Sequence, residues 1–382
     1  MTQPASAVVG MVGGGQLARM TAHAAGPLDV RLRVLARQQG ESATRAAAEV
    51  LLGDPDDAAS VRALASGCDA VTFDHELVGP QGLEALLATG VPVRPSPEAL
   101  RYAQDKAFQR QRFTEAGLDV PAFRAVDRLT DARAAALELG LPVVMKTTRG
   151  GYDGRGVWPA GDERELTRTL EGLKGHAGAL VVEEAVPLAS ELAVLVARRP
   201  GGERVTYPLV ETVQQDGICT ELAVPARVPD CVAAAAVALG ERAVEITGAI
   251  GLVAVELFWT GERVLVNEVA TRPHNSGHWT IEGAVTSQFA NHLRAVLDWP
   301  LGVTCARAPA VATVNVLGAA ENADPRNNVA AALGLADVAV HLYGKEPWVG
   351  RKLGHVTALG DDADETRTRA REAAARLRGG GR

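Results

Sequence analysis

Two glutamates, Glu256 and Glu268, lie in apolar runs that the sequence predicts to be neighbouring β-strands. The runs VAVELFW and RVLVNEV flank the turn-forming residues Thr-Gly-Glu, so a turn near Gly261 brings the carboxylates opposite each other. Opposed like charges destabilise a sheet, and burying an unpaired carboxylate is costly. The pair therefore predicts a shared cation, and Mg²⁺ fits because it takes one or two carboxylates together with substrate phosphates. The alternative is that both side chains face solvent or pair with arginine.

A second chemical signal is the glycine-rich run RGGYDGRGVW (149–158), which directly follows the apolar segment PVVMKT. It is not a Walker A loop, but its glycines allow backbone N–H groups to approach a polyphosphate. Lys146 ends the preceding strand, where its ammonium group would reach the same phosphates. The alternative is a simple turn with solvated charges, and the combination of glycines, Arg155 and Lys146 favours phosphate binding.

The run GMVGGGQLARM (10–20) follows an apolar strand and opens a helix. Gly13, Gly15 and Ala18 fit the dinucleotide pattern, but the expected acidic residue after the second strand is missing. A phosphate contact and a tight turn therefore stay open, and NAD is disfavoured. Glu76 follows another predicted parallel strand, where it is either a ribose ligand or a solvated loop residue.

Histidines and cations gather in two later motifs. In HNSGHW, His274 and His278 have the i,i+4 spacing of zinc ligands on a helix, but Ser-Gly between them favours a loop that lines a substrate pocket. In LYGKEPWVGRKLGH (342–355), cations surround turn residues. Such a cluster is either a solvated face or a site for a phosphate monoester.

These residues are positioned by an alternation of strands and helices. Over 6–100 the pattern predicts βαβ units and a parallel sheet, followed by a helical stretch at 97–116. A second α/β unit spans 120–186, and consecutive strands then surround a long helix at about 229–247. The Arg- and Ala-rich tail after 361 predicts a surface helix with a frayed end. The fold class is therefore mixed α/β and α+β.

The composition restricts the class of protein. The 382 residues carry 39 Lys plus Arg against 46 Asp plus Glu, a net charge of −7, which argues against binding nucleic acid or a membrane surface through bulk charge. The four cysteines are scattered without a CxxC pair, which argues against a disulfide framework or zinc site and favours a reducing cytoplasm. No run predicts a transmembrane helix, and a basic signal-peptide region is lacking.

Together, the motifs resemble those of ATP-grasp enzymes, and among them the N5-carboxyaminoimidazole ribonucleotide synthase family. The resemblance runs in order from residue 8 to about 357. HNSGHWT and YGK…GRKLGH are specific to this family, whereas the lysine, glycine loop and glutamates are general to ATP-grasp proteins. It implies an ATP-grasp fold with a Rossmann-like preATP-grasp domain (1–105), a small lid domain (106–186), and a large domain (187–382) whose C-terminal, β-rich segment binds substrate.

The resemblance also implies that the cofactors are ATP and two Mg²⁺ ions. Metal ligands would be Glu256 and Glu268. The implied ATP-binding residues are Lys106, Lys146, Gly151, Tyr152, Asp153, Gly154, Arg155, Gly156, Val157, Glu183, Glu184, Ala185, Val186, Glu191, Gln214, Asn267 and Glu268. Gln214 stands where the family commonly has histidine, so a titrating role at that position is in doubt.

The other implied substrates are bicarbonate and 5-aminoimidazole ribonucleotide. The residues implied to bind the ribonucleotide are Gly15, Gln16, Glu76, Asn275, Lys345, Arg351 and Lys352, and those implied in catalysis are Tyr152, Asp153, Arg155, His274 and Lys345. Bicarbonate would attack the γ-phosphate to give carboxyphosphate, which carboxylates the exocyclic amine, and Asp153 would take or relay the amine proton. The family further implies a homodimer.

Three rival classes stay open at this point. A different ATP-grasp ligase would share the lysine, glycine loop and glutamates but would not need HNSGHW and YGK…GRKLGH. A non-enzymatic nucleotide-binding protein would tolerate loss of the metal carboxylates. An NAD-dependent oxidoreductase rests on Gly13–Ala18 alone.

Overall fold

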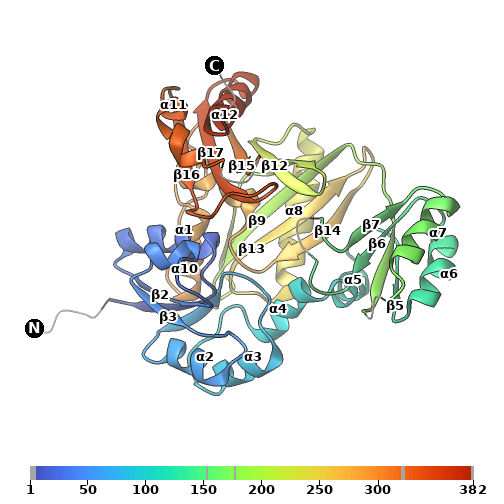
Figure 1. The fold of residues 1–382 in the computed structure, drawn as a ribbon, viewed down its shortest axis with the longest axis horizontal. Coiled ribbons are helices and arrows are strands. Elements are labelled where there is room, and N and C mark those ends of the chain that lie inside the picture. The colour runs from blue at the N-terminus through green and yellow to red at the C-terminus, as the bar shows by residue number, and fades with distance from the viewer. Residues whose placement is uncertain (1–5, 152–153, 176–177, 320–322, 380–382) are drawn as a thin grey trace, which may run out of the picture.

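The computed structural model describes residues 6–151, 154–175, 178–319 and 323–379. Its strands form three sheets, each with its own covering helices (Figure 1). In Figure 1 the first sheet lies at the lower left, the second at the right, and the third runs between them toward the C-terminal elements at the top. The predicted mixture of α/β and α+β architecture is confirmed.

The first sheet is parallel, as the βαβ pattern predicts, with strand order β3-β2-β1-β4. Its strands are β1 (Val8–Val12), β2 (Arg31–Ala36), β3 (Glu49–Leu52) and β4 (Ala70–Phe73). Its helices are α1 (Gln16–Ala25), η1 (Gly26–Leu28), η2 (Ser42–Arg45), α2 (Ala58–Ala65) and α3 (Pro80–Leu87). The sheet is buried on both faces, which explains its continuous apolar strands.

The predicted helical stretch at 97–116 is two helices, α4 (Pro97–Gln104) and α5 (Lys106–Glu115). The break falls at Asp105, which has extended backbone angles and whose carboxylate accepts the N–H of Phe108. Such N-capping restarts a helix in a new direction. The break places Lys106 in the first turn of α5.

The second sheet is antiparallel, with strand order β5-β8-β6-β7. Its strands are β5 (Phe123–Val126), β6 (Val143–Thr147), β7 (Val157–Ala160) and β8 (Leu180–Glu184). Helices α6 (Leu129–Leu139) and α7 (Glu163–Gly172) cover its outer face, at the far right of Figure 1. Its other face is left to meet the third sheet.

The third sheet has nine strands among the described residues, with β14-β13-β9-β11-β12-β15-β17-β16 in order and β10 beside β9. The strands are β9 (Ser190–Arg198), β10 (Arg204–Thr206), β11 (Val210–Gln215), β12 (Ile218–Val224), β13 (Gly251–Trp259), β14 (Val264–Ala270), β15 (Ala310–Leu317), β16 (Val338–Leu342) and β17 (Lys352–Gly360). The helices are α8 (Asp230–Thr247), η3 (Asn275–Gly277), α9 (Thr280–Gly283), α10 (Gln288–Val296), η4 (Pro325–Asn328), α11 (Val329–Leu333) and α12 (Ala363–Leu377).

The prediction that the C-terminal tail is a surface helix is only half right, because α12 buries one face against β15 and β17. Ala370, Ala373, Ala374 and Leu377 are fully buried, at the spacing of one helical face. The same helix carries Arg367, whose guanidinium contacts Glu211 at 2.9 Å and the buried Glu221 at 2.5 Å. The alanine content of the tail is thus a packing surface.

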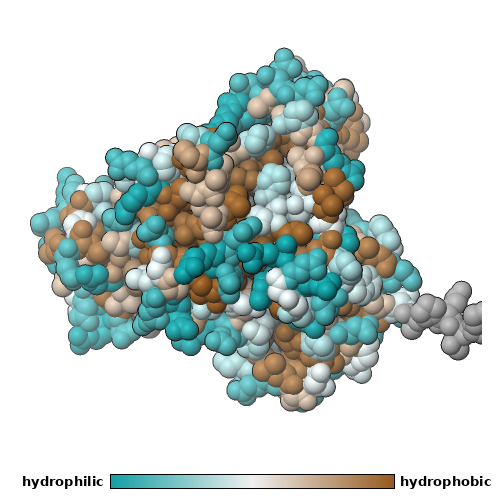
Figure 2. Space-filling model, turned by 180° about the vertical axis from the view of Figure 1, so that it is seen from behind, coloured by the Kyte–Doolittle hydropathy of each residue, from teal (hydrophilic) through white to brown (hydrophobic). Residues whose placement is uncertain are grey.

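No helix in the described ranges is long and apolar enough to cross a membrane. Figure 2 shows the surface from behind, where apolar residues gather in patches between hydrophilic ones.

We predict that Arg367→Met lowers the free energy of unfolding by about 1–3 kcal/mol, because the buried Glu221 loses one of its two arginine partners and keeps Arg371, whose Nε lies 2.6 Å from Oε2. Chemical unfolding followed by circular dichroism measures this change. The matched control is Arg376→Met, which removes a partly exposed i,i+4 pair with Glu372 on the same helix. Equal effects of the two substitutions would contradict the assignment.

Candidate functional site

The β13–β14 hairpin places Glu256 directly opposite Glu268 in its antiparallel ladder, as the sequence predicts. The register shifts immediately after Glu256, so the pair sits at an irregular point of the hairpin. Glu256 and Glu268 keep 30% and 39% of their side-chain surface exposed, and we call the space beside these two carboxylates the recess. The hairpin therefore presents two carboxylates side by side to whatever enters the recess.

The two carboxylates are compensated unequally. Lys106 Nζ lies 2.6 Å from Glu268 Oε1. Burial raises the pKa of Glu268, but Lys106, Lys146 and Arg110 together outweigh it and lower that pKa. Burial, followed by the charges of Glu268 and Glu191, raises the pKa of Glu256 to about 7. His274 Nε2 is 3.4 Å from Glu256, but burial and then Arg272 lower the pKa of His274 to about 3, so this imidazole is neutral. Glu256 is therefore less well compensated than Glu268, and its carboxyl is about half protonated at pH 7.

A second lysine crosses from the small sheet to the hairpin. Lys146 Nζ lies 2.7 Å from Glu183 Oε2 and donates to Asn267 Oδ1 at 3.2 Å. Glu183 is 2% exposed and also receives Arg110 Nε at 2.7 Å. Burial raises the pKa of Glu183, but Arg110 and Lys146 outweigh it and bring it to about 2. The Glu183 side chain is thus committed to holding two cations.

The glycine-rich loop is folded tightly enough to require its glycines. A Cβ on Gly151 would lie 2.8 Å from Arg155 O, and one on Gly156 would lie 2.6 Å from Thr147 Oγ1. Gly154 has φ +76° and lies against the β11–β12 turn, close to Asp216 and Gly217. The loop therefore reaches from the small sheet to the large one. The predicted site residues Tyr152 and Asp153 lie outside the described residues.

The other predicted ATP-binding residues lie where the chain passes from the second sheet to the third. Ala185 follows β8 and donates its backbone N–H to Pro142 O at 3.0 Å. Glu184 accepts the N–H of Ala122 at 3.0 Å. Glu191 on β9 pairs with Thr212 on β11, and burial raises its pKa. Val186 continues the crossing segment and Gln214 lies at the β11–β12 irregularity.

Residues of the first domain close the recess from its other side. Arg272 Nε lies 2.7 Å from Glu76 Oε2, and the N–H of Thr271 donates to Glu76 Oε1 at 3.3 Å. Gln16 Oε1 accepts Lys345 Nζ at 2.6 Å, which joins α1 to the C-terminal segment. The Glu76 carboxylate is therefore held by Arg272, a residue that the sequence analysis did not single out.

The N-terminus of α1 is occupied by a carboxylate of the protein. Asp74 accepts the N–H of Gly15 at 2.6 Å and that of Ala18 at 2.7 Å. A Cβ on Gly15 would lie 2.2 Å from Asp74 Oδ2, so glycine is required for this approach. These N–H groups are consequently not available to a phosphate, and the glycine motif is explained by Asp74.

The residues of the predicted cation cluster have different contacts in the structure. Lys345 reaches Gln16, and the charge of Lys352 acts on Glu256 and His274. Arg351 instead stacks its guanidinium 3.5 Å from the centre of the Trp348 ring and donates to Glu346 O.

The predicted histidine motif forms a loop and a 3₁₀ turn. His274 Nδ1 contacts Ser276 Oγ at 2.8 Å, and Asn275 Nδ2 donates to Asn315 Oδ1 at 3.0 Å. His278 is fully buried and stacks on His355 at 4.8 Å. Within the described ranges, no three His, Cys, Asp or Glu side chains form a metal site by themselves. The zinc alternative therefore lacks support, whereas two carboxylates awaiting phosphate ligands fit Mg²⁺.

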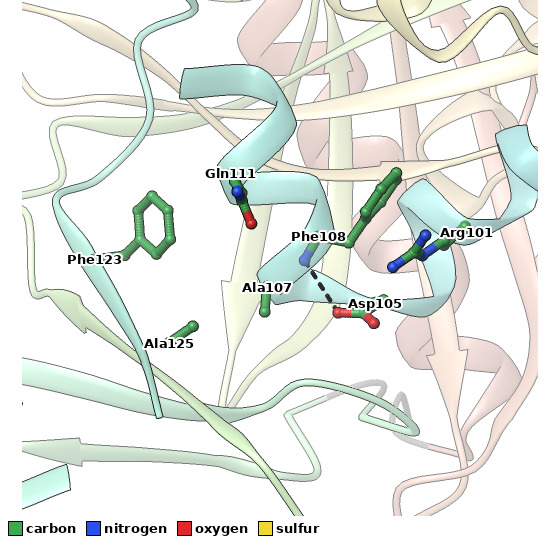
Figure 3. A pocket seen from close by; sticks show the side chains of 7 residues that line it. All are labelled: Arg101, Asp105, Ala107, Phe108, Gln111, Phe123 and Ala125. Atoms are coloured by element: carbon green, nitrogen blue, oxygen red, sulfur yellow. Dashed lines mark hydrogen bonds between the residues drawn. The ribbon is translucent and has the colours of Figure 1, made fainter. Parts of the chain in front are cut away.

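A hollow of about 380 Å³ lies outside this recess, around the first turn of α5. Figure 3 shows Phe123 and Ala125 of β5 on one side of the helix and Arg101 and Asp105 on the other. The Arg101 guanidinium lies 3.9 Å from the centre of the Phe108 ring. The hollow wraps a helix end at the junction with the small sheet and does not include the lysines or glutamates of the recess.

The comparisons with known proteins match this architecture along nearly the whole chain. Residues 6–104 match the ribonucleotide synthetase preATP-grasp domain, 111–289 the ATP-grasp domain, and 311–369 the phosphoribosylaminoimidazole carboxylase C-terminal domain. The N5-carboxyaminoimidazole ribonucleotide synthase of Mycobacterium tuberculosis is 46% identical over 373 residues, covering 96% of this chain and 87% of the relative. The chain belongs to the N5-carboxyaminoimidazole ribonucleotide synthase family of ATP-grasp proteins.

Other members of this family agree in sequence and in structure. The Corynebacterium ammoniagenes synthase is 43% identical over 383 residues, covering 97% of this chain and 92% of the relative. The Aspergillus clavatus synthase, solved in complex with ADP and 5-aminoimidazole ribonucleotide, has a TM-score of 0.89 at 32% identity and covers 98% and 99% of the two chains. The Thermus thermophilus synthetase has a TM-score of 0.86 at 36% identity, with 97% and 98% coverage.

We predict that Glu183→Gln flattens the acid-induced loss of stability. A carboxyl whose pKa falls from 4.5 to about 2 on folding contributes about 3 kcal/mol above pH 4.5, and this contribution is lost as the pH falls toward 2. The variant should be less stable at pH 7 and approach the wild type near pH 2, as measured by urea unfolding across this range. Glu171→Gln, an exposed glutamate on α7, is the control. Parallel pH profiles for wild type and Glu183→Gln would contradict the account.

Proposed function

We propose that this chain carboxylates 5-aminoimidazole ribonucleotide with bicarbonate and ATP to give N5-carboxyaminoimidazole ribonucleotide, ADP and phosphate, a step of de novo purine biosynthesis. The observation that carries the proposal is the Glu256–Glu268 pair, which two lysines from other elements approach at the meeting of three sheets. Membership in the synthase family supports the choice of substrate.

The triphosphate would lie between the hairpin and the small domain, held by Lys106, Lys146 and the loop Gly151–Val157. Lys146 is already oriented by Glu183, so little side-chain entropy is lost when it meets a phosphate. The glycine loop would contribute backbone N–H donors. The crossing segment at Glu183–Val186 would meet adenine through its backbone, and Glu191 would bind the ATP ribose. Asn267 and Gln214 would complete the ATP site, with Gln214 acting as a neutral hydrogen-bonding group.

The carboxylate pair fits Mg²⁺, because it offers hard oxygen ligands and carries negative charge that Lys106 and the neutral His274 leave uncompensated. Glu256 and Glu268 would hold two Mg²⁺ ions. Bound Mg²⁺ would neutralise charge on the phosphates during phosphoryl transfer. Until then, Lys106 supplies the positive charge at Glu268.

In the proposed reaction, a bicarbonate oxygen attacks the γ-phosphorus and ADP leaves, giving carboxyphosphate. The exocyclic amine of the ribonucleotide then forms a C–N bond to the carboxyl carbon, and the C–O bond to phosphate breaks. Tyr152, Asp153, Arg155, His274 and Lys345 would surround this centre, and Asp153 would take or relay the amine proton. His274, being neutral, would orient bicarbonate through hydrogen bonds rather than charge.

The ribonucleotide would lie on the first-domain side of the recess. Its proposed contacts are Gly15, Gln16, Glu76, Asn275, Lys345, Arg351 and Lys352. Gly15 would allow the ribonucleotide to approach the backbone closely. Its N–H would not bind the ribonucleotide, because it donates to Asp74. The division into domains at 105/106 and 186/187, a homodimeric state and a cytoplasmic location are proposed with this function and rest on the family resemblance.

The test is ADP release by the purified chain with Mg-ATP and bicarbonate, with and without 5-aminoimidazole ribonucleotide. We expect turnover that requires the ribonucleotide and that falls about 100-fold or more in Glu268→Gln, because charge stabilisation in the reacting site is lost. Glu262→Gln, an exposed glutamate in the turn of the same hairpin, should retain full activity.

The outcomes separate the rival functions. ATP hydrolysis that is indifferent to the ribonucleotide would keep the ATP-grasp chemistry and exclude the proposed substrate. If the chain binds nucleotide but hydrolyses ATP with none of the acceptors tested, this result would favour a non-enzymatic binding protein.

A further inference from the structure

The two segments that carry Lys106 and Lys146 are tied to each other through their backbones. The N–H of Lys106 donates to Thr148 O at 2.9 Å, which joins the start of α5 to the chain just past β6. The residues next to this hydrogen bond form an ion pair, in which Arg149 Nη2 lies 2.9 Å from Asp105 Oδ2. A backbone hydrogen bond and an ion pair therefore connect the turn before α5 to the start of the glycine-rich loop.

The side chains of the two lysines reach consecutive residues of β14. Lys106 Nζ lies 2.6 Å from Glu268 Oε1, and Lys146 Nζ donates to Asn267 Oδ1 at 3.2 Å. The two lysine segments are thus joined twice, at their side chains by β14 and at their main chains by the ion pair and the backbone hydrogen bond. This closed ring of contacts fixes the spacing of the two ammonium groups from both ends.

The Asp105 carboxylate serves both the helix and the loop. Its Oδ1 accepts the N–H of Phe108 at 3.1 Å, which caps α5 (Figure 3), and its Oδ2 accepts a hydrogen bond from Arg149. The Asp105 side chain is 15% exposed, whereas that of Arg149 is 60% exposed. Because one carboxylate caps the helix and holds the loop, the position of Lys106 in the first turn of α5 is coupled to the position of the loop.

The hollow around this end of α5 increases the weight of the polar contacts there. It lies between α5 and the residues Phe123 and Ala125 of β5 (Figure 3). A space of about 380 Å³ interrupts the apolar packing between the helix and the small sheet. The buried Arg110–Glu183 pair is another polar link between these elements. The attachment of α5 to the small sheet therefore depends on ion pairs more than on apolar contacts at this place.

We propose that Asp105 and Arg149 are positioning residues for ATP. Their ion pair holds the first turn of α5 and the glycine-rich loop together, so that Lys106, Lys146 and the loop meet the same triphosphate. The inference rests on the proposed function and deepens it, because neither residue belongs to the predicted ATP site. Such pre-organisation reduces the entropy that is lost when the nucleotide binds. The rival role is that Arg149, at the start of the glycine-rich run, binds a phosphate directly.

The first experiment measures the Kd of Mg-ADP by titration calorimetry for Arg149→Met, Asp105→Asn and the double variant. Asparagine also caps helices, so Asp105→Asn removes the ion pair and keeps the cap. We expect each single substitution to raise the Kd about 2- to 5-fold, the range for a partly exposed ion pair. The double variant should match the single variants, because all three lack the same interaction. The control is Arg128→Met, which removes an exposed pair with Asp131 in the same domain and should bind as the wild type does.

The sign of the effect in Asp105→Asn separates the two roles of Arg149. If the ion pair positions the loop, its loss raises the Kd of Mg-ADP. If Arg149 is instead a direct phosphate ligand, Asp105→Asn releases the guanidinium and removes a negative charge near the site, so the Kd falls. A lower Kd in Asp105→Asn, together with a higher Kd in Arg149→Met, would overturn the inference.

Steady-state kinetics supply a readout that a general loss of stability would not move selectively. We expect Arg149→Met and Asp105→Asn to raise the KM for ATP and to leave the KM for the ribonucleotide unchanged, and equal increases in both KM values would overturn the inference. The Mg-ADP titration does not require turnover. If the titrations follow the expected pattern but turnover does not require the ribonucleotide, the positioning role holds and the proposed function fails. If ribonucleotide-dependent turnover occurs while both single variants bind Mg-ADP as the wild type does, the function holds and the positioning role is wrong.

Discussion

Two carboxylates held in direct opposition by the β13–β14 ladder are the constraint on which the rest of the site depends. Their side chains lie opposite each other on one face of the β13–β14 strand pair, so the backbone holds the two carboxylates close together. The fold answers this repulsion only partly, with one ammonium at Glu268 and a neutral imidazole at Glu256. The pKa of Glu256 is raised to about 7 because its charge is only partly compensated in this buried place. The recess is thus built to receive cations together with the anionic nucleotide.

Ion pairs also connect the elements that surround the carboxylate pair. Glu183 pairs with both Arg110 and Lys146 in the interior. The pair with Glu183 holds the Lys146 ammonium in place beside the hairpin. Glu76 holds Arg272 where the first domain meets the large sheet. Each of these pairs joins residues of different sheets or helices, so the charges that position the ligands also fix the domains around them.

Much of the site is predictable from sequence because its signals are local. The opposition of Glu256 and Glu268 follows from strand alternation and a nearby turn, and the glycine loop after Lys146 follows from composition alone. Arg110 and Asp74 were missed because their partners lie 73 and 59 residues away, which no local pattern reveals. The split of the 97–116 helix rests on one capping carboxylate, and the buried face of α12 reads in sequence as an ordinary Ala-rich surface helix. The stacking of Arg351 on Trp348 is likewise a contact that the sequence analysis did not predict.

The most direct test of the account is the number of protons released when Mg-ADP binds, measured by titration calorimetry at pH 7 in buffers of different ionisation enthalpy. A carboxyl with a pKa of about 7 is half protonated there and must ionise when cations join it, so the wild type should release about half a proton more than Glu256→Gln. The same difference should vanish at about pH 9, where Glu256 is already ionised. Identical proton release by wild type and Glu256→Gln at pH 7 would contradict the claim that this carboxylate is left uncompensated for a cation.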